Sequence, residues 1–142
     1  MSMKSIKVYL KGEERIVDID KENYSLIIDS ELSYPMVAKN YEDTEKLHRI
    51  DNVFNILIFS VNRCDKNGRE LFTDDVIYVE GVEYVIKSKG GSTLDNYFNN
   101  SPTIMIEGLY NDNAINLDKI KNDSITLIGS VFDRGIYDKL RL

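Results

Sequence analysis

The sequence predicts a mainly β fold: a small antiparallel sandwich or barrel with one or two short helices, or an α+β variant of it. Short runs of alternating apolar and polar residues recur along the chain, as half-buried strands require. Glycine, asparagine and aspartate stand between many of these runs, which is typical of tight turns. No repeat, low-complexity tract or linker divides the chain, so we expect a single β-rich domain over residues 1–142.

The N-terminal part begins with a predicted hairpin. Residues 6–10 and 15–19 alternate in strand fashion on either side of Gly12, and residues 24–28 form a third strand candidate. The β pattern then lapses from residue 33 to residue 51, where we expect a short helix or an irregular excursion.

The middle of the chain holds the strongest apolar segment. Residues 53–61 are rich in β-branched and aromatic side chains and predict a buried central strand. Asn67 and Gly68 predict a turn after it, because both accept the positive φ values of tight turns. A second hairpin is expected from two strands over residues 75–79 and 82–87, joined by a turn at residues 80–81.

The C-terminal part continues the β pattern after a polar loop. Residues 90–101 predict that loop, and residues 103–110 and 124–132 predict strands. Residues 114–120 predict a short strand or turn, and the tail can close as one helical turn. We expect one core, and its predicted members are Ile56, Ile58, Val76, Tyr84, Ile86, Ile104, Ile106, Leu127 and Val131.

Composition and charge favour a folded protein that avoids phosphate-rich partners. The 142 residues are 42% hydrophobic and 30% charged, which is typical of a globular chain. The net charge of −6 opposes approach to nucleic acid and to an anionic membrane. We therefore expect neither non-specific nucleic-acid binding nor membrane binding.

The single cysteine and the start of the chain indicate a reducing compartment. Cys64 is alone, so an internal disulfide and a zinc site built on several thiolates are both excluded. The first residues lack the apolar run of a signal peptide, and residues 56–59 are too few to span a bilayer. We expect a cytoplasmic protein, in the host cell cytoplasm if a phage encodes it.

No residue pattern predicts catalysis, a metal or a cofactor. His48 is the only histidine, and its polar surroundings are typical of a solvent-facing side chain. Gly68 at the sixth position of a calcium loop would place Arg63 at the first, where a cation cannot be a ligand. We expect no catalytic residue, no metal site and no cofactor.

Aromatic residues give the clearest indication of a binding site. Tyr9, Tyr78, Tyr84 and Tyr110 lie in strand patterns, where aromatic side chains usually pack in a core or across strands. Tyr97 and Phe98 instead lie in the polar loop, between Asn96 and Asn99. Loop aromatics are enriched at recognition surfaces, although the same pair can also pack back onto the core. We take these four loop residues as candidate contacts.

Basic residues near the centre of the chain form a second candidate set. A phosphate needs arginine or lysine, and a base needs an aromatic side chain on which to stack. The basic candidates for a nucleotide-like small molecule are Arg63, Arg69, Lys87 and Lys89.

The residues from Cys64 to Tyr78, CDKNGRELFTDDVIY, resemble the segment that opens the second part of YopX-like phage proteins, whose pattern is D-K-N-G-K-E-I-[FY]-x-G-D-I-V. Residues 125–133, ITLIGSVFD, resemble that family's closing V-I-G-N-[IV]-Y-[DE] element. Asp74 stands where the family has glycine, and Arg134-Gly135 stands where it has Asn-Pro. The resemblance covers about residues 62–137 and implies a small β-rich phage or prophage protein, with no catalytic residues to carry over.

Two functions remain open from the sequence. The first is a non-enzymatic accessory binding protein of a phage or prophage that occupies a host protein, with inhibition of a host defence complex as a subcase. The second is a protein that binds or sequesters a nucleotide-like small molecule, or an unrecognised enzyme acting on one. The oligomeric state is not defined by the sequence.

Overall fold

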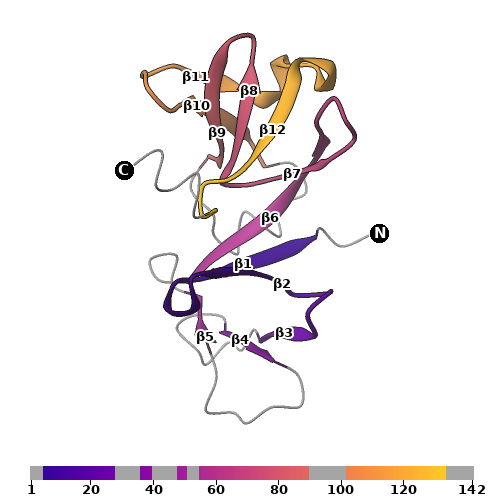
Figure 1. The fold of residues 1–142 in the computed structure, drawn as a ribbon, viewed down its shortest axis with the longest axis vertical. Coiled ribbons are helices and arrows are strands. Elements are labelled where there is room, and N and C mark those ends of the chain that lie inside the picture. The colour runs from indigo at the N-terminus through magenta and orange to yellow at the C-terminus, as the bar shows by residue number, and fades with distance from the viewer. Residues whose placement is uncertain (1–4, 28–35, 40–47, 51–54, 90–101, 134–142) are drawn as a thin grey trace. The chain divides into compact units, whose positions relative to one another are not determined.

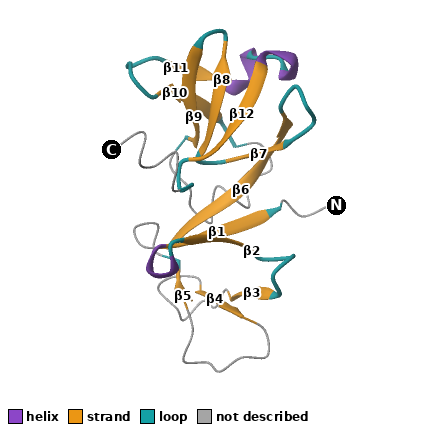
Figure 2. Cartoon of the chain, viewed as in Figure 1, coloured by secondary structure: helices purple, strands orange, loops and turns teal. Residues whose placement is uncertain are grey.

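The computed structural model describes residues 5–27, 36–39, 48–50, 55–89 and 102–133 (Figure 1). The chain divides into an N-terminal unit, Ser5–Ile58, and a C-terminal unit, Phe59–Leu142 with Met1–Lys4. Strands dominate both units, and the described helical content consists of short 3-10 turns (Figure 2). All strand pairs with a defined register are antiparallel, so the predicted mainly β, antiparallel fold class is confirmed.

The N-terminal unit begins with the predicted hairpin. Strand β1 (Ile6–Leu10) and strand β2 (Arg15–Asp18) pair in antiparallel register on either side of the 3-10 turn η1 (Lys11–Glu13). Every second residue of β1 is buried, as the alternating sequence predicts. Val8 and Val17 face each other in this register and are both fully buried.

A small three-stranded sheet follows, with the order β3-β4-β5. Strand β3 (Tyr24–Ile27) was expected, whereas β4 (Met36–Lys39) and β5 (His48–Arg49) lie where the sequence pattern lapses. The expectation of a helix or irregular excursion over this whole stretch is therefore wrong at β4 and β5. Pairing with β3 supplies the backbone hydrogen bonds that make so short a segment extended. Residues 40–47 lie outside the described residues.

Strand β6 (Asn55–Cys64) is the predicted central strand and continues three residues beyond the expected end. Its residues 57–61 are buried. The strand runs without a break from the N-terminal unit into the C-terminal one, where it pairs with β7 (Glu70–Phe72). The expectation of a single domain stays a prediction.

The C-terminal unit contains a five-stranded antiparallel sheet with the order β11-β10-β9-β8-β12 (Figure 1). Its strands are β8 (Asp75–Val79), β9 (Val82–Ser88), β10 (Ile104–Gly108), β11 (Ala114–Asn116) and β12 (Ile125–Ser130). Two 3-10 turns, η3 (Leu117–Lys119) and η4 (Asn122–Ser124), connect β11 to β12. The strands expected in this half of the chain are thus all present.

Both predicted turns adopt left-handed backbone conformations. Gly68 has φ 78°, and the β8–β9 turn has φ 48° at Glu80 and 88° at Gly81. Positive φ at both central residues is typical of the hairpin turn whose twist matches that of paired strands. The β8–β9 turn sets the register in which Ile77 faces Tyr84 and Val76 faces Val85.

The core of the C-terminal unit lies on one face of the five-stranded sheet. Tyr84, Ile86, Ile104 and Ile106 belong to it as predicted, and Leu127 packs against it partly buried. Val76 is buried as predicted, although it lies outside this cluster: Val76 and Ile77 are neighbours on β8 and point to opposite faces, and Ile77 belongs to the cluster. The remaining core residues are Val61, Leu71, Val79, Leu117 and Ile125.

Three residues of the predicted core lie elsewhere. Ile58 is buried in the N-terminal unit. Ile56 and Val131 are half-buried.

Candidate binding surface and pocket

A buried carboxylate organises the turn that follows β6. The Asp65 side chain is 0% exposed, and its Oδ1 accepts hydrogen bonds from the backbone N–H groups of Asn67 and Arg69, both at 2.9 Å. Its Oδ2 accepts from the Leu127 N–H at 3.0 Å and from the Arg69 guanidinium. One side chain thus connects the turn to β12, far away in the sequence.

Arg69 completes this connection. Its Nη2 lies 2.8 Å from Asp65 Oδ2 and donates to the Leu127 carbonyl at 2.9 Å. Burial raises the pKa of Asp65, but the hydrogen bonds from Leu127 and Arg69 outweigh it and hold the pKa well below its usual range. Asp65 is therefore a structural anion, and Arg69 already has a carboxylate partner.

A bulge in β6 directs Arg63 toward the connection between β11 and β12. Ser60 pairs with Phe72 and Cys64 with Glu70, so β6 uses more residues than β7 between these two pairs. The guanidinium of Arg63 then donates to the carbonyls of Leu117 and Ile120 and to Asn122 Oδ1, the last at 2.7 Å. Arg63 thereby holds both 3-10 turns against β6.

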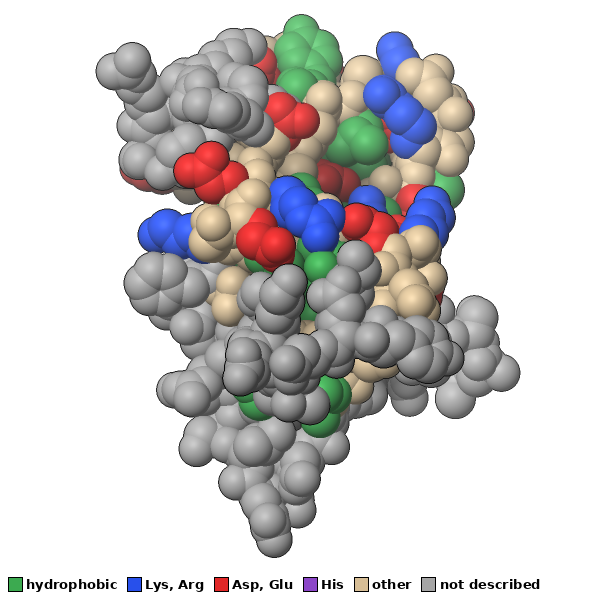
Figure 3. Space-filling model, turned by 60° about the horizontal axis from the view of Figure 1, so that its bottom comes forward, with side chains coloured by type: hydrophobic (Ala, Val, Ile, Leu, Met, Phe, Trp, Pro, Cys, Tyr) green, Lys and Arg blue, Asp and Glu red, His purple; other side chains and the backbone are tan. Residues whose placement is uncertain are grey.

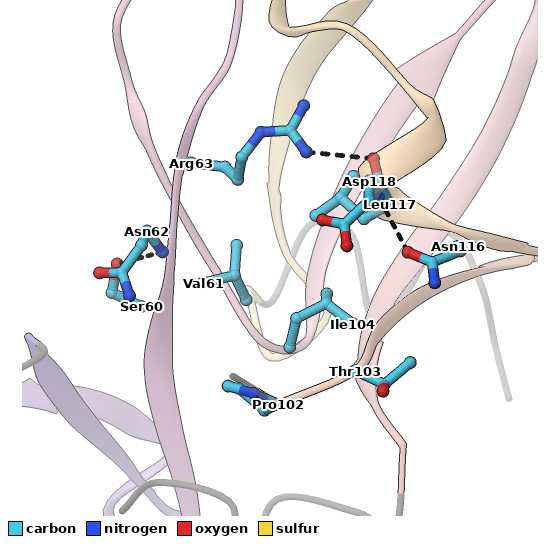
Figure 4. A pocket seen from close by; sticks show the side chains of 10 residues that line it. All are labelled: Ser60, Val61, Asn62, Arg63, Pro102, Thr103, Ile104, Asn116, Leu117 and Asp118. Atoms are coloured by element: carbon cyan, nitrogen blue, oxygen red, sulfur yellow. Dashed lines mark hydrogen bonds between the residues drawn. The ribbon is translucent and has the colours of Figure 1, made fainter. Parts of the chain in front are cut away.

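Beside Arg63 lies a pocket of about 290 Å³ within the C-terminal unit (Figure 4). Three chain segments line it: residues 60–63 of β6, residues 102–104 at the start of β10, and residues 116–118 at η3. Its apolar lining consists of Val61, Pro102, Ile104 and Leu117, and the other lining residues are polar (Figure 4). The pocket therefore places the Arg63 guanidinium beside apolar side chains.

A second buried polar turn joins β7 to β8. Asp74 has φ 64°, and its carboxylate accepts from Lys87 Nζ at 2.6 Å. Thr73 Oγ1 accepts from the Phe59 N–H at 3.1 Å, and Asp75 Oδ2 accepts from the Phe72 N–H at 2.8 Å. Asp74 thus has a left-handed backbone conformation, which glycine adopts without strain and other residues adopt rarely.

The predicted basic candidates have different surroundings in the structure. Arg69 and Lys87 are paired with carboxylates, and Arg63 bonds neutral oxygens beside the pocket. Lys89 is exposed, and its backbone N–H donates to the Thr103 carbonyl at 2.8 Å. Only Arg63 of these four lines the pocket.

The predicted aromatic contacts lie outside the described residues. These are Asn96, Tyr97, Phe98 and Asn99. The hydrogen bond between Lys89 and Thr103 joins the two strands next to the segment that contains them. Their assignment as contacts stays a prediction.

The structure exposes two tyrosines that their strand pattern assigns to packing. Tyr78 is 45% exposed and Tyr110 69% exposed, whereas Tyr84 is buried as expected. Ile128 is 43% exposed, at the point where a bulge interrupts the pairing of β12 with β8. Tyr78, Tyr110 and Ile128 are the exposed large apolar side chains of the described C-terminal unit. Tyr78 follows Ile77 on β8, so once the structure places Ile77 on the core face, alternation turns Tyr78 to the opposite face.

On the face drawn in Figure 3, acidic and basic side chains lie next to one another among the described residues. Within the described ranges, no group of three or more His, Cys, Asp and Glu side chains is placed to hold a metal ion. None of the helices described is long and apolar enough to cross a membrane.

Comparison with known proteins identifies a structural neighbour. No protein-family model matches the chain, and no curated protein matches it. The crystal structure of protein yopX from Bacillus subtilis is similar, with a TM-score of 0.49 and 14% sequence identity, and the match covers 92% of this chain and 94% of that one. This solved structure carries the name of the family that residues 64–78 and 125–133 resemble.

Proposed function

We propose that this chain is a non-enzymatic phage or prophage accessory protein that acts by occupying the surface of a host protein. The observation that carries the proposal is the exposure of three apolar side chains of the C-terminal unit, those of Tyr78, Tyr110 and Ile128. Apolar and aromatic side chains that stay in water favour association, because a partner that covers them removes their area from solvent. Inhibition of a host defence complex is the specific subcase that we propose.

The segment over residues 90–101 is the second proposed contact. Lys89 and Thr103, which lie just outside this segment, are joined by a backbone hydrogen bond, and strands β9 and β10 on either side of it are paired. Aromatic side chains such as Tyr97 and Phe98 bury a large area at little cost in rotamer entropy, which suits recognition of a partner.

The proposal is tested by quantitative capture of host polypeptides from lysate. We expect the intact chain to retain a defined polypeptide, and the double variant Tyr97→Ala/Phe98→Ala to retain less of it with a nearly unchanged melting temperature. Loss of several degrees in melting temperature would instead assign the pair to packing. If no polypeptide is retained and a substrate is turned over in a manner that depends on His48 or Cys64, the proposal is wrong.

The pocket beside Arg63 favours a second candidate function, the binding of a nucleotide-like small molecule. The three acceptors of the Arg63 guanidinium are neutral, so among the described residues its positive charge has no carboxylate partner. A phosphate is the kind of group that such a guanidinium attracts. Native mass spectrometry of the purified chain, with absorbance near 260 nm, is expected to reveal a copurified ligand under this function and none under the first.

A further inference from the structure

Tyr78 and Tyr110 lie at the same end of the C-terminal sheet. Tyr78 on β8 pairs with Glu83 on β9, and the Glu83 carbonyl accepts a hydrogen bond from the Leu109 N–H at 3.1 Å. Tyr110 is the next residue along the chain. The two exposed rings therefore belong to one continuous stretch across β8, β9 and the β10–β11 loop.

Every charged residue of this stretch is acidic. Residues 76–86 and 105–116 contain four carboxylates, from Glu80, Glu83, Glu107 and Asp112, and no lysine or arginine. Glu80, Glu107 and Asp112 are exposed, and Glu83 is half-buried. The first basic residue after this part of β9 is Lys87, which is paired with Asp74 at 2.6 Å. We call this stretch, residues 76–86 and 105–116, the tyrosine end of the sheet.

The loops of the tyrosine end are held by local hydrogen bonds. The Gly108 N–H donates to the Asn113 carbonyl at 2.8 Å, and the Asn113 N–H donates to Asn111 Oδ1 at 2.9 Å. The β8–β9 turn has the left-handed backbone of a tight hairpin turn. Contacts displayed on such fixed turns lose little conformational entropy when a partner binds.

We infer that the tyrosine end binds a basic segment of a partner protein, rich in lysine or arginine; this inference rests on the proposed function and names the chemistry of the partner. Ammonium and guanidinium groups are attracted both to carboxylates and to the faces of tyrosine rings. A second copy of this chain would oppose carboxylates to carboxylates, and phosphate groups of nucleic acid would be repelled in the same way. A basic polypeptide is the occupant that satisfies both the aromatic and the acidic groups.

The test uses a labelled lysine-rich peptide and its glutamate counterpart, titrated against the full chain by fluorescence anisotropy. We expect the lysine peptide to bind and the glutamate peptide not to bind, with affinity falling about tenfold or more as sodium chloride rises from about 0.05 M to about 0.5 M. Failure of the intact chain to prefer the lysine peptide would overturn the inference.

Two variants and a matched control locate the binding. The triple variant Glu80→Gln/Glu107→Gln/Asp112→Asn and the double variant Tyr78→Ser/Tyr110→Ser are each expected to weaken peptide binding about tenfold. The control Glu70→Gln/Asp118→Asn/Asp123→Asn removes the same charge from other exposed sites of the unit and should stay within about twofold. An equal loss in the control would show attraction to net charge alone and overturn the inference.

The outcome separates this inference from the proposed function. If the tyrosine variant unfolds, the triple charge variant still decides, because its three side chains are exposed in the sheet's turns and outer face. A chain that captures a host polypeptide equally well with and without these substitutions would overturn the inference and leave the proposed function standing. Concentration-dependent dimers that are lost in the tyrosine variant would also overturn it, in favour of a second copy as the occupant.

Discussion

At the residue scale, the C-terminal unit depends on a few buried carboxylates that accept backbone hydrogen bonds. Asp65 connects the turn after β6 to β12, and Asp75 accepts from the Phe72 N–H between β7 and β8. A buried anion is tolerated only where donors compensate its lost hydration, and four donor groups surround Asp65. The sequence signals the turn at Asp65, but the partner Leu127 becomes visible only in the fold.

Replacing Asp65 with asparagine should destabilise the protein by about 2 to 4 kcal/mol at neutral pH, because a buried hydrogen-bond network loses its charged acceptor. The folded-state pKa of Asp65 lies below its usual value, so its contribution is present above about pH 4 and is lost as the pH falls further. Urea unfolding of the parent chain and of the Asp65→Asn variant should therefore give unfolding free energies whose difference becomes smaller below about pH 4.

The exposed Asp118→Asn variant is the matched control, and it should change the unfolding free energy by less than about 0.5 kcal/mol. This account of Asp65 would be contradicted if the difference in unfolding free energy between Asp65→Asn and the parent chain grew on acidification.

Asp74 offers a second measurement at this scale. Its backbone has φ 64°, a region that glycine occupies without strain and alanine does not. The variants Asp74→Gly and Asp74→Ala both lose the ion pair with Lys87, so their difference reports the backbone alone. We expect the alanine variant to be less stable by about 1 kcal/mol in thermal or urea unfolding. An alanine variant as stable as the glycine variant would show that the backbone relaxes.

At the element scale, the hairpins were predictable because their turn residues and their alternating strands indicate the same structure. The β8–β9 hairpin has its turn at Glu80-Gly81 as expected, and β1 pairs with β2 around η1. Strand β4 was not predictable, because its extended conformation depends on pairing with β3 rather than on its own residue pattern. Alternation alone does not tell which of Val76 and Ile77 belongs to the core cluster of the C-terminal unit, because both are apolar and buried.

The turn glycines should respond to substitution through backbone strain alone. A Cβ added at Gly68 would meet nothing within 4 Å, and at Gly81 only the Tyr78 hydroxyl at 3.9 Å. Gly68→Val and Gly81→Val are therefore each expected to cost about 1 to 3 kcal/mol, measured by urea unfolding. Gly12, also with open space but without a positive φ, serves as the control in Gly12→Ala. Equal costs at all three sites would refute the assignment of these turns.

Core truncation tests the sheet face that the structure assigns. Ile86 and Ile106 face each other in the β9–β10 register and are fully buried, so Ile86→Ala should cost about 2 to 5 kcal/mol in unfolding free energy. Ile128→Ala removes the same side chain from an exposed position and should cost less than about 1 kcal/mol. Similar losses at the two sites would mean that the faces are exchanged.

At the scale of the whole molecule, the fold class was predictable and the candidate surface only in part. Composition, alternation and turn chemistry indicated the β fold. The exposure of Tyr78 and Tyr110 could not be predicted from the sequence, because aromatic side chains in strands are usually packed. Tyr78 is exposed because of the register of β8, and Tyr110 because it follows the end of β10. The ion pairs of Arg69 with Asp65 and of Lys87 with Asp74 could not be predicted either, because the tertiary fold determines which carboxylate lies near each basic side chain.

The central claim is that the chain acts by presenting a surface of its C-terminal unit to a host protein. Amide hydrogen exchange of the chain, with and without the host polypeptide that it captures, tests this claim most directly. The account predicts slower exchange in the complex over residues 78–83 and 107–113, which contain Tyr78 and Tyr110. Protection confined to the N-terminal hairpin of β1 and β2, or no difference anywhere at saturating partner, would contradict it.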